Sequence, residues 1–167
     1  IFKDNATALI NKAVPKPSEQ QEDTALEAAM NYVAERGVTS VHNMSDFQGA
    51  FERAHERGKL KTRIYAGMSL YDWKILDAKI KQAGRGDAWL RRGGLKEYVD
   101  GSLGSRTAAF FKPFEDTPLD SGFFVNKPEY LYRQIKSADS AGLQVMVHAI
   151  GDKAIHTLLN IFDQVAK

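Results

Sequence analysis

The feature that most constrains this sequence is an alternation of short apolar stretches with amphipathic helical patterns. Stretches rich in apolar and β-branched residues occur at 38–44, 62–68, 94–99 and 143–148. Between them, and after the last one, apolar residues recur every three or four positions, which is typical of helices with one buried face. Strands that alternate with helices predict an α/β fold in which a parallel sheet is covered by helices.

The helix ends carry sequence signals of their own. Ser18 and Gln21 have the spacing of a capping box, and Gly37 is expected to end the helix that they begin. The residues expected to begin or cap the later helices are Asp46, Asp72, Pro128 and Asp152. These signals are independent of the apolar pattern, so the two sets of observations support the same elements.

Composition limits the classes of protein to which the chain can belong. With 167 residues, 43% of them hydrophobic and 26% charged, the chain suits one globular domain, and we expect residues 1–167 to form it. The net charge of +2 is spread among acids, which argues against nucleic acid as a partner. No apolar run reaches the ~20 residues that span a bilayer, so we expect no membrane insertion. The absence of cysteine excludes disulfides and fits a reducing compartment, which favours the cytoplasm.

His148 ends the fourth strand-like stretch, "LQVMVH". Parallel α/β proteins place their chemistry at the carboxyl ends of the strands, so His148 is expected at the edge of the sheet where sites are built. A histidine that merely packs at a strand end is the alternative. Asp152, four residues later, is interpreted as a helix cap, and a catalytic role is the alternative.

The third strand-like stretch continues into "KEYVDGSLGSR" and contains a lysine. A lysine inside a strand is costly unless its amine reaches water, a partner or a metal. Strand alternation places Lys96, Tyr98 and Asp100 on one face, which indicates a polar face near the carboxyl end. The alternative is that Lys96 lies at the start of the strand and extends its amine into solvent.

Two segments together resemble a known family. "GLKEYVDGSLGSRTAAF" (94–110) and "GLQVMVHAIGDKAI" (142–155) are similar to the metal-dependent amidohydrolases, in the branch related to N-substituted formamide deformylases and the exoenzyme regulatory protein AepA. The stretch 5–44 is similar to the part of that family that leads into the second barrel strand. The resemblance implies a (β/α)8 barrel with one or two divalent ions, usually zinc, at the carboxyl ends of its strands.

The resemblance also implies roles for individual residues. Lys96 matches a fourth-strand lysine that can be carbamylated and bridge the metals, and His148 matches a histidine ligand at the end of the fifth strand. The activity implied is hydrolysis of a carbon–nitrogen bond in a small amide or formamide-like substrate by a metal-activated water. The family's first-strand His-x-His pair, sixth-strand histidine and eighth-strand aspartate have no match here. We therefore expect a partial barrel, the second to fifth strands of a longer enzyme, with no catalytic residue of its own and no activity in isolation.

Three further side chains are expected around the pocket as substrate contacts. They are Asp100, Arg106 and His42. For Arg106 a structural ion pair is the alternative, and for His42 the alternative to a metal ligand is a polar residue that lines the barrel. His55 and His156 lie at helix positions expected to face solvent.

Other interpretations remain open at this stage. One is a non-catalytic α/β module that keeps the scaffold and binds a partner or small molecule. Another is an unrelated flavodoxin-like domain that binds an anion at helix N-termini. A sheet of four parallel strands also has two open edges, so we expect the chain to self-associate, most simply as a symmetric dimer.

Overall fold

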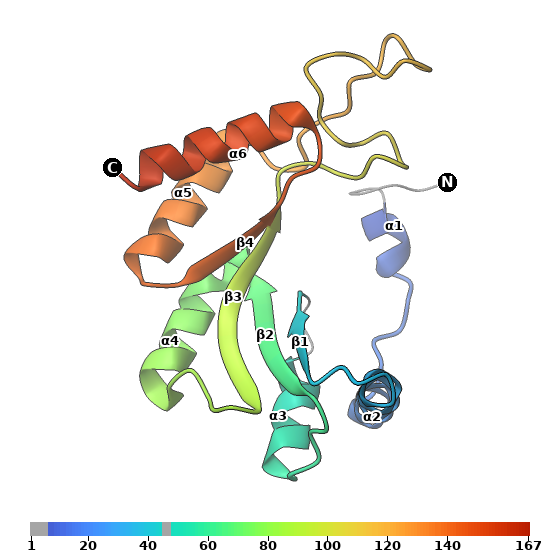
Figure 1. Ribbon diagram of the computed structural model, residues 1–167, viewed down its shortest axis with the longest axis vertical. Coiled ribbons are helices and arrows are strands. Elements are labelled where there is room, and N and C mark those ends of the chain that lie inside the picture. Colours follow the sequence, from blue (N-terminus) through green and yellow to red (C-terminus); the bar gives the residue numbers. More distant parts are fainter. Residues whose placement is uncertain (1–6, 45–47) are drawn as a thin grey trace. The chain divides into compact units, whose positions relative to one another are not determined.

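A computed structural model describes residues 7–44 and 48–167 of the chain (Figure 1). Helices and strands alternate along it as the sequence predicts. The elements in chain order are α1 (Ala8–Asn11), α2 (Glu19–Ala34), β1 (Ser40–Asn43), α3 (Gln48–Glu56), β2 (Arg63–Ser69), the 3-10 helix η2 (Leu70–Asp72), α4 (Trp73–Ala83), β3 (Leu90–Tyr98), α5 (Pro128–Ser140), β4 (Gln144–His148) and α6 (Asp152–Val165). In the described part of the chain, no helix is both long and apolar enough to cross a bilayer.

The strands form one sheet in the order β1-β2-β3-β4. β2 runs parallel to both β1 and β3, and its register shifts against β3 between Ala66 and Met68. The predicted α/β class with parallel strands is confirmed. Neighbours in the sheet are also neighbours in sequence, whereas a flavodoxin-like sheet has the order 2-1-3-4-5. The flavodoxin-like alternative is therefore wrong.

The chain divides into two compact units. One comprises Pro15–Lys96, and the other comprises Ile1–Val14 together with Glu97–Lys167. β3 contributes residues to both units. That residues 1–167 form one domain stays a prediction.

In the unit Pro15–Lys96, α2 begins as the sequence predicts. The Gln21 amide donates to Ser18 Oγ at 3.3 Å, and the Ser18 amide donates to Gln21 Oε1 at 2.8 Å, which completes the capping box. The core of this unit consists of Phe51, Ile64, Ala66 and Leu90, with Leu26, Val41 and Leu60 packed against it.

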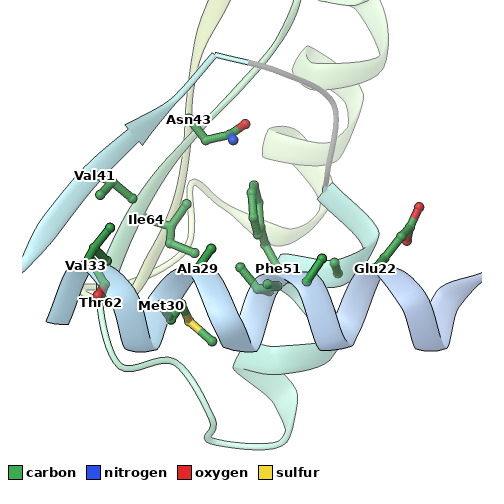
Figure 2. A pocket seen from close by; sticks show the side chains of 12 residues that line it. Glu22, Ala29, Met30, Val33, Val41, Asn43, Phe51, Thr62 and Ile64 are labelled. Atoms are coloured by element: carbon green, nitrogen blue, oxygen red, sulfur yellow. The ribbon is translucent and has the colours of Figure 1, made fainter. Parts of the chain in front are cut away.

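A mainly apolar pocket of about 360 Å³ lies beside α2 (Figure 2). Its lining includes Val41 and Asn43 of β1, together with residues of α2, α3 and β2. Because side chains alternate along a strand, His42 faces the opposite side of the sheet from these two residues. The pocket therefore fixes which face of β1 carries the histidine.

Several predicted boundaries need correction. α6 is capped by Gly151, and Asp152 is its first residue, so Asp152 is not the cap. β1 covers Ser40–Asn43 and is shorter at both ends than the predicted 38–44, whereas β3 begins at Leu90, four residues before the predicted start. Asp46 lies outside the described residues.

The unit that contains Glu97–Lys167 is built around α5 and α6. Its fully or nearly fully buried side chains include Val99, Leu131, Ile135, Ala138, Ala154, Leu158 and Ile161. The long connection between β3 and α5 is tied to this core by backbone hydrogen bonds such as Val125 N to Val99 O, at 2.8 Å. The connection therefore has fixed contacts where it follows β3.

Candidate functional site

His148 is the last residue of β4, as predicted. Its side chain is 24% exposed, and its Nε2 lies 2.7 Å from the carbonyl oxygen of Gly101. A carbonyl oxygen only accepts hydrogen bonds, so Nε2 carries the hydrogen. In the neutral ring this leaves the lone pair on Nδ1, which is the form of histidine that binds a metal through Nδ1. The Tyr98 ring lies beside the imidazole, with 5.4 Å between ring centroids.

Asp100 follows β3 and is 0% exposed. Its Oδ2 accepts hydrogen bonds from the Ala109 and Gly151 amides, both at 2.8 Å, and its Oδ1 accepts one from the Ile150 amide at 3.0 Å. Oδ1 also lies 3.7 Å from His148 Nε2. The structure thus gives this carboxylate backbone partners, and its expected contact with a substrate stays a prediction.

Lys96 is the seventh residue of β3, which runs from Leu90 to Tyr98, so it lies near the carboxyl end and not at the start. It is half-buried and pairs in register with Ser69. Ser69 shares a face of β2 with Tyr65, whose ring lies 4.9 Å from that of His42. One face of this unit therefore carries His42, Tyr65, Ser69 and Lys96.

The close approach of Tyr65 also explains one of the glycines that precede Lys96, Gly93. A Cβ on Gly93 would lie 1.8 Å from Cζ of Tyr65. Glycine at this position makes room for the Tyr65 ring over β3.

Arg106 forms an ion pair with Asp116 in the connection after β3. The hydrogen bond from Arg106 holds the pKa of the Asp116 carboxyl below its usual range. Arg106 also has a positive φ of 58°, which few residues other than glycine adopt. The structure shows the ion pair that was one of the two alternatives, and a contact between Arg106 and a substrate stays a prediction.

The remaining histidines, His55 and His156, lie on the helices α3 and α6. His156 is exposed and lies near Asn160 and Phe111. His55 is partly exposed, and its Nε2 lies 2.8 Å from an Asp87 carboxylate oxygen. Both positions are consistent with the surface histidines that the helix pattern predicts.

Sequence reasoning missed two glycines that shape the surroundings of His148. Gly101 supplies the carbonyl that fixes the ring, and Gly151 leaves no space for a side chain because a Cβ there would lie 1.9 Å from Ala109 O. Gly101 directly follows Asp100, and Gly151 directly precedes Asp152. The position of each glycine next to a candidate residue, Asp100 or Asp152, is the only sequence signal that could have pointed to it.

The donors fit a divalent metal in kind but not in number. Imidazole with its second nitrogen bonded to a carbonyl is a common arrangement for a metal ligand, and a carbamylated lysine supplies a carboxylate oxygen. Within residues 7–44 and 48–167, however, no group of three or more His, Cys, Asp or Glu side chains is arranged to hold an ion. Lys96 and His148 also belong to different units.

Comparison with known proteins decides the family. The protein-family model described as "Amidohydrolase family" matches residues 1–167. The chain belongs to this family. It is 34% identical over 98% of its length to "Protein LONG AFTER FAR-RED 3" of Arabidopsis thaliana, covering 30% of that protein. It is 33% identical over 96% of its length to "Putative amidohydrolase YtcJ" of Bacillus subtilis (strain 168), covering 31%.

A solved structure agrees with these relatives. An "uncharacterized metal-dependent hydrolase" from Pyrococcus horikoshii OT3 matches with a TM-score of 0.79 and 32% identity, over 95% of this chain and 33% of that one. The predicted fold class, a partial (β/α)8 barrel of parallel βα units, is confirmed. The chain spans about a third of the length of the proteins that it matches.

Proposed function

We propose that the protein to which this chain belongs is a metal-dependent hydrolase that cleaves carbon–nitrogen bonds in small amide or formamide-like molecules. Lys96 and His148 are its metal ligands in this segment, and His42, Asp100 and Arg106 surround the substrate. Membership of the amidohydrolase family supports the proposal, as does the similarity to the metal-dependent hydrolase from Pyrococcus horikoshii OT3.

The observation that carries the proposal is the hydrogen bond from His148 Nε2 to the Gly101 carbonyl, at 2.7 Å. It selects one tautomer and one orientation of the ring. A metal ligand requires such a fixed tautomer, because only the unprotonated nitrogen binds the metal.

The two proposed ligands act by different chemistry. His148 would contribute a neutral nitrogen donor. Lys96 would contribute a carboxylate oxygen once its neutral amine has formed a bond to CO2 and released a proton to water. A bound divalent ion, for which zinc is the first candidate, polarises the scissile carbonyl and lowers the pKa of a bound water to about 7. This segment's own part is to hold donors at the carboxyl ends of two strands, and the other ligands come from elsewhere in the protein.

The first test is metal content in the full-length protein. His148→Ala and Lys96→Ala each delete a ligand, so each is expected to lower the bound metal by at least about tenfold, measured by plasma mass spectrometry after dialysis. His156→Ala and Lys81→Ala are the matched controls, because both side chains are exposed on helices. If His148→Ala or Lys96→Ala keeps its full metal content, the substituted residue is not a metal ligand.

A second measurement separates the hydrolase from a non-catalytic binding module. The wild-type full-length protein is incubated with a panel of N-formyl amines and simple amides, and the released amine is quantified. Turnover that disappears with a chelator and returns with zinc supports the hydrolase. Metal binding without turnover on any member of the panel favours the binding module.

We also propose that the 167-residue chain pairs with a second copy of itself. β1 and β4 lie at the two ends of the strand order, and edge strands offer backbone groups to another chain. Light scattering during size-exclusion chromatography is expected to give twice the 18.6 kDa of one chain. A single species at the mass of one chain, at tens of micromolar, contradicts the pairing.

A further inference from the structure

The fully buried carboxylate of Asp100 is unusual within this chain. Burying a charged group is costly unless it is paired or hydrogen-bonded, and Asp100 meets this cost with backbone donors, the amides of Ala109, Ile150 and Gly151. Hydrogen bonds from neutral donors to a charged acceptor are stronger than those between neutral groups. This carboxylate therefore fixes the positions of the groups that surround it.

The three donors come from two segments that are far apart in sequence. Ala109 belongs to the connection after β3, whereas Ile150 and Gly151 form the turn between β4 and α6. Asp100 joins the two segments through separations of 9, 50 and 51 residues. The carboxylate thus acts as the shared anchor of the connection and the turn.

Neighbouring contacts bring the same two segments together. The Ala154 amide donates to Ala109 O at 3.2 Å, and the Phe111 amide donates to Asp152 Oδ1 at 2.9 Å. At Gly151 a Cβ would lie 1.9 Å from Ala109 O, so the backbones are as close as glycine allows. The junction around Asp100 is closely packed and has little room to shift.

The position of the His148 ring depends on this junction. Gly101, whose carbonyl accepts the Nε2 hydrogen, is the residue directly after Asp100. His148 itself lies two residues before Ile150, and its own carbonyl accepts a hydrogen bond from the Val99 amide at 2.8 Å. Both the ring and the acceptor that orients it are therefore attached to segments that Asp100 holds.

We propose that Asp100 is a positioning residue, which fixes the Gly101 carbonyl against His148 and so sets the tautomer of the imidazole for metal binding. This role rests on the proposed function, because positioning the imidazole matters for metal binding only if His148 is a metal ligand. It differs from the sequence expectation for Asp100, since the carboxylate acts through the backbone and need not touch a substrate.

The test uses Asp100→Asn in the full-length protein with ¹⁵N-labelled histidine. The amide side chain keeps the size of the carboxylate but replaces one acceptor oxygen with a donor, so at least one backbone amide loses its partner. Metal affinity is measured by competition with a chelator, and the His148 ring nitrogens are observed by NMR in the metal-free protein at fixed neutral pH. The His148 signals are assigned by their absence in His148→Ala.

The matched control is Asp152→Asn. Asp152 also accepts a backbone hydrogen bond from the connection after β3, through Phe111, but it is exposed. We expect Asp100→Asn to weaken metal binding about tenfold to a hundredfold and to remove the single Nε2–H tautomer. Asp152→Asn is expected to change neither. If Asp100 is purely structural, Asp100→Asn lowers the unfolding temperature but leaves metal affinity and the His148 tautomer unchanged in the folded protein. That result overturns the proposal.

The two proposals fail in different ways. If His148→Ala keeps its metal, the ligand assignment fails, and the tautomer readout in Asp100→Asn still decides the positioning role. If His148→Ala loses metal while Asp100→Asn keeps both metal affinity and tautomer, the positioning role fails alone. If Asp100→Asn does not fold, Gly151→Ala is used in its place. The added Cβ clashes with the Ala109 backbone and so disturbs the junction, while the Asp100 carboxylate is kept. Unchanged readouts in that variant also overturn the proposal.

Discussion

Two aspartates, one at each end of β3, receive similar hydrogen bonds in opposite surroundings. Asp87 precedes the strand, its side chain is 52% exposed, and its Oδ1 accepts hydrogen bonds from the Trp89 and Leu90 amides at 2.8 and 3.0 Å. Asp100 follows the strand, is 0% exposed and accepts three backbone hydrogen bonds. Asp87 accepts both of its backbone hydrogen bonds from its own turn, and its one distant contact is with the partly exposed side chain of His55. Asp100 instead joins backbone segments that are up to 51 residues apart.

The comparison shows how burial changes the contribution that the same kind of hydrogen bond makes to the free energy of unfolding. Water replaces the partners of an exposed carboxylate when they are lost, so the loss is small. The buried amides of Ala109 and Gly151 have no such replacement when they lose Asp100, and they keep their full desolvation cost. We therefore expect the two ends of β3 to respond very differently to matched substitutions.

The largest effect is expected for Asp100→Ala. The buried amides of Ala109 and Gly151 lose their acceptor, as does the part-buried amide of Ile150. At about 1–3 kcal/mol for each of the two buried unsatisfied groups, the free energy of unfolding should fall by about 2–6 kcal/mol. Asp87→Ala is the paired substitution at the exposed end and should cause a much smaller loss. Urea denaturation of both variants measures the difference, and equal losses would contradict the comparison.

A second pair of variants compares two glycines with similar backbone angles. Gly122, in the connection after β3, has φ 71°, and a Cβ there would lie 1.8 Å from Ala108 O. Gly37, after α2, has φ 76° and no atom within 4 Å of the added Cβ.

Both alanine variants incur the left-handed conformational cost of about 1–2 kcal/mol, and only Gly122→Ala adds a backbone clash of about 1–3 kcal/mol. The unfolding free energy of Gly122→Ala should therefore fall by about 2–5 kcal/mol, against about 1–2 kcal/mol for Gly37→Ala. Denaturant melts of the two variants decide the matter. A larger loss for Gly37→Ala would show that the connection yields to the clash.

The smallest effect concerns pH and the exposed end of β3. Hydrogen bonds from the Leu90 and Trp89 amides, and then from His55, lower the pKa of Asp87 to about 2. A lowered folded pKa means that the stabilisation by Asp87 is fully present above its unfolded pKa of about 3.9 and is lost as the pH falls through about 2.

The difference in unfolding free energy between wild type and Asp87→Asn should therefore be constant above about pH 5 and shrink between about pH 4 and 2. Urea titrations at a series of pH values measure this difference. A difference that grows as the pH falls would show that the sign is wrong.

Much of the architecture could be predicted from sequence because its signals are local. The capping box at Ser18 needs only residues three positions apart, and His148 at the end of β4 follows from an apolar run that stops. The start of β3 was predicted too late because Arg91 and Arg92 interrupt its apolar pattern. Arg92 is accommodated by Glu52 of α3, at 3.0 Å, which is a contact that the local sequence does not show.

The candidate site was harder to predict for the same reason. Type and position suggested Lys96 and His148, and alternation placed Asp100 on a face with Tyr98. Asp100 is buried, whereas Tyr98 is 43% exposed. The partners of Asp100 are backbone amides, which every residue other than proline carries, so no residue type marks them. No pattern in the sequence predicts that the Gly101 carbonyl accepts a hydrogen bond from His148 Nε2.

The long-range partners of Asp100 also set an order of events during synthesis. Gly151 is made 51 residues after Asp100, which at about 5–20 residues per second takes roughly 3–10 s. Of the three backbone donors, only Ala109, nine residues after Asp100, is made early in this interval, because the turn after β4 does not yet exist. The connection after β3 therefore lacks its Asp100-mediated tie to the turn after β4 until that turn has been made.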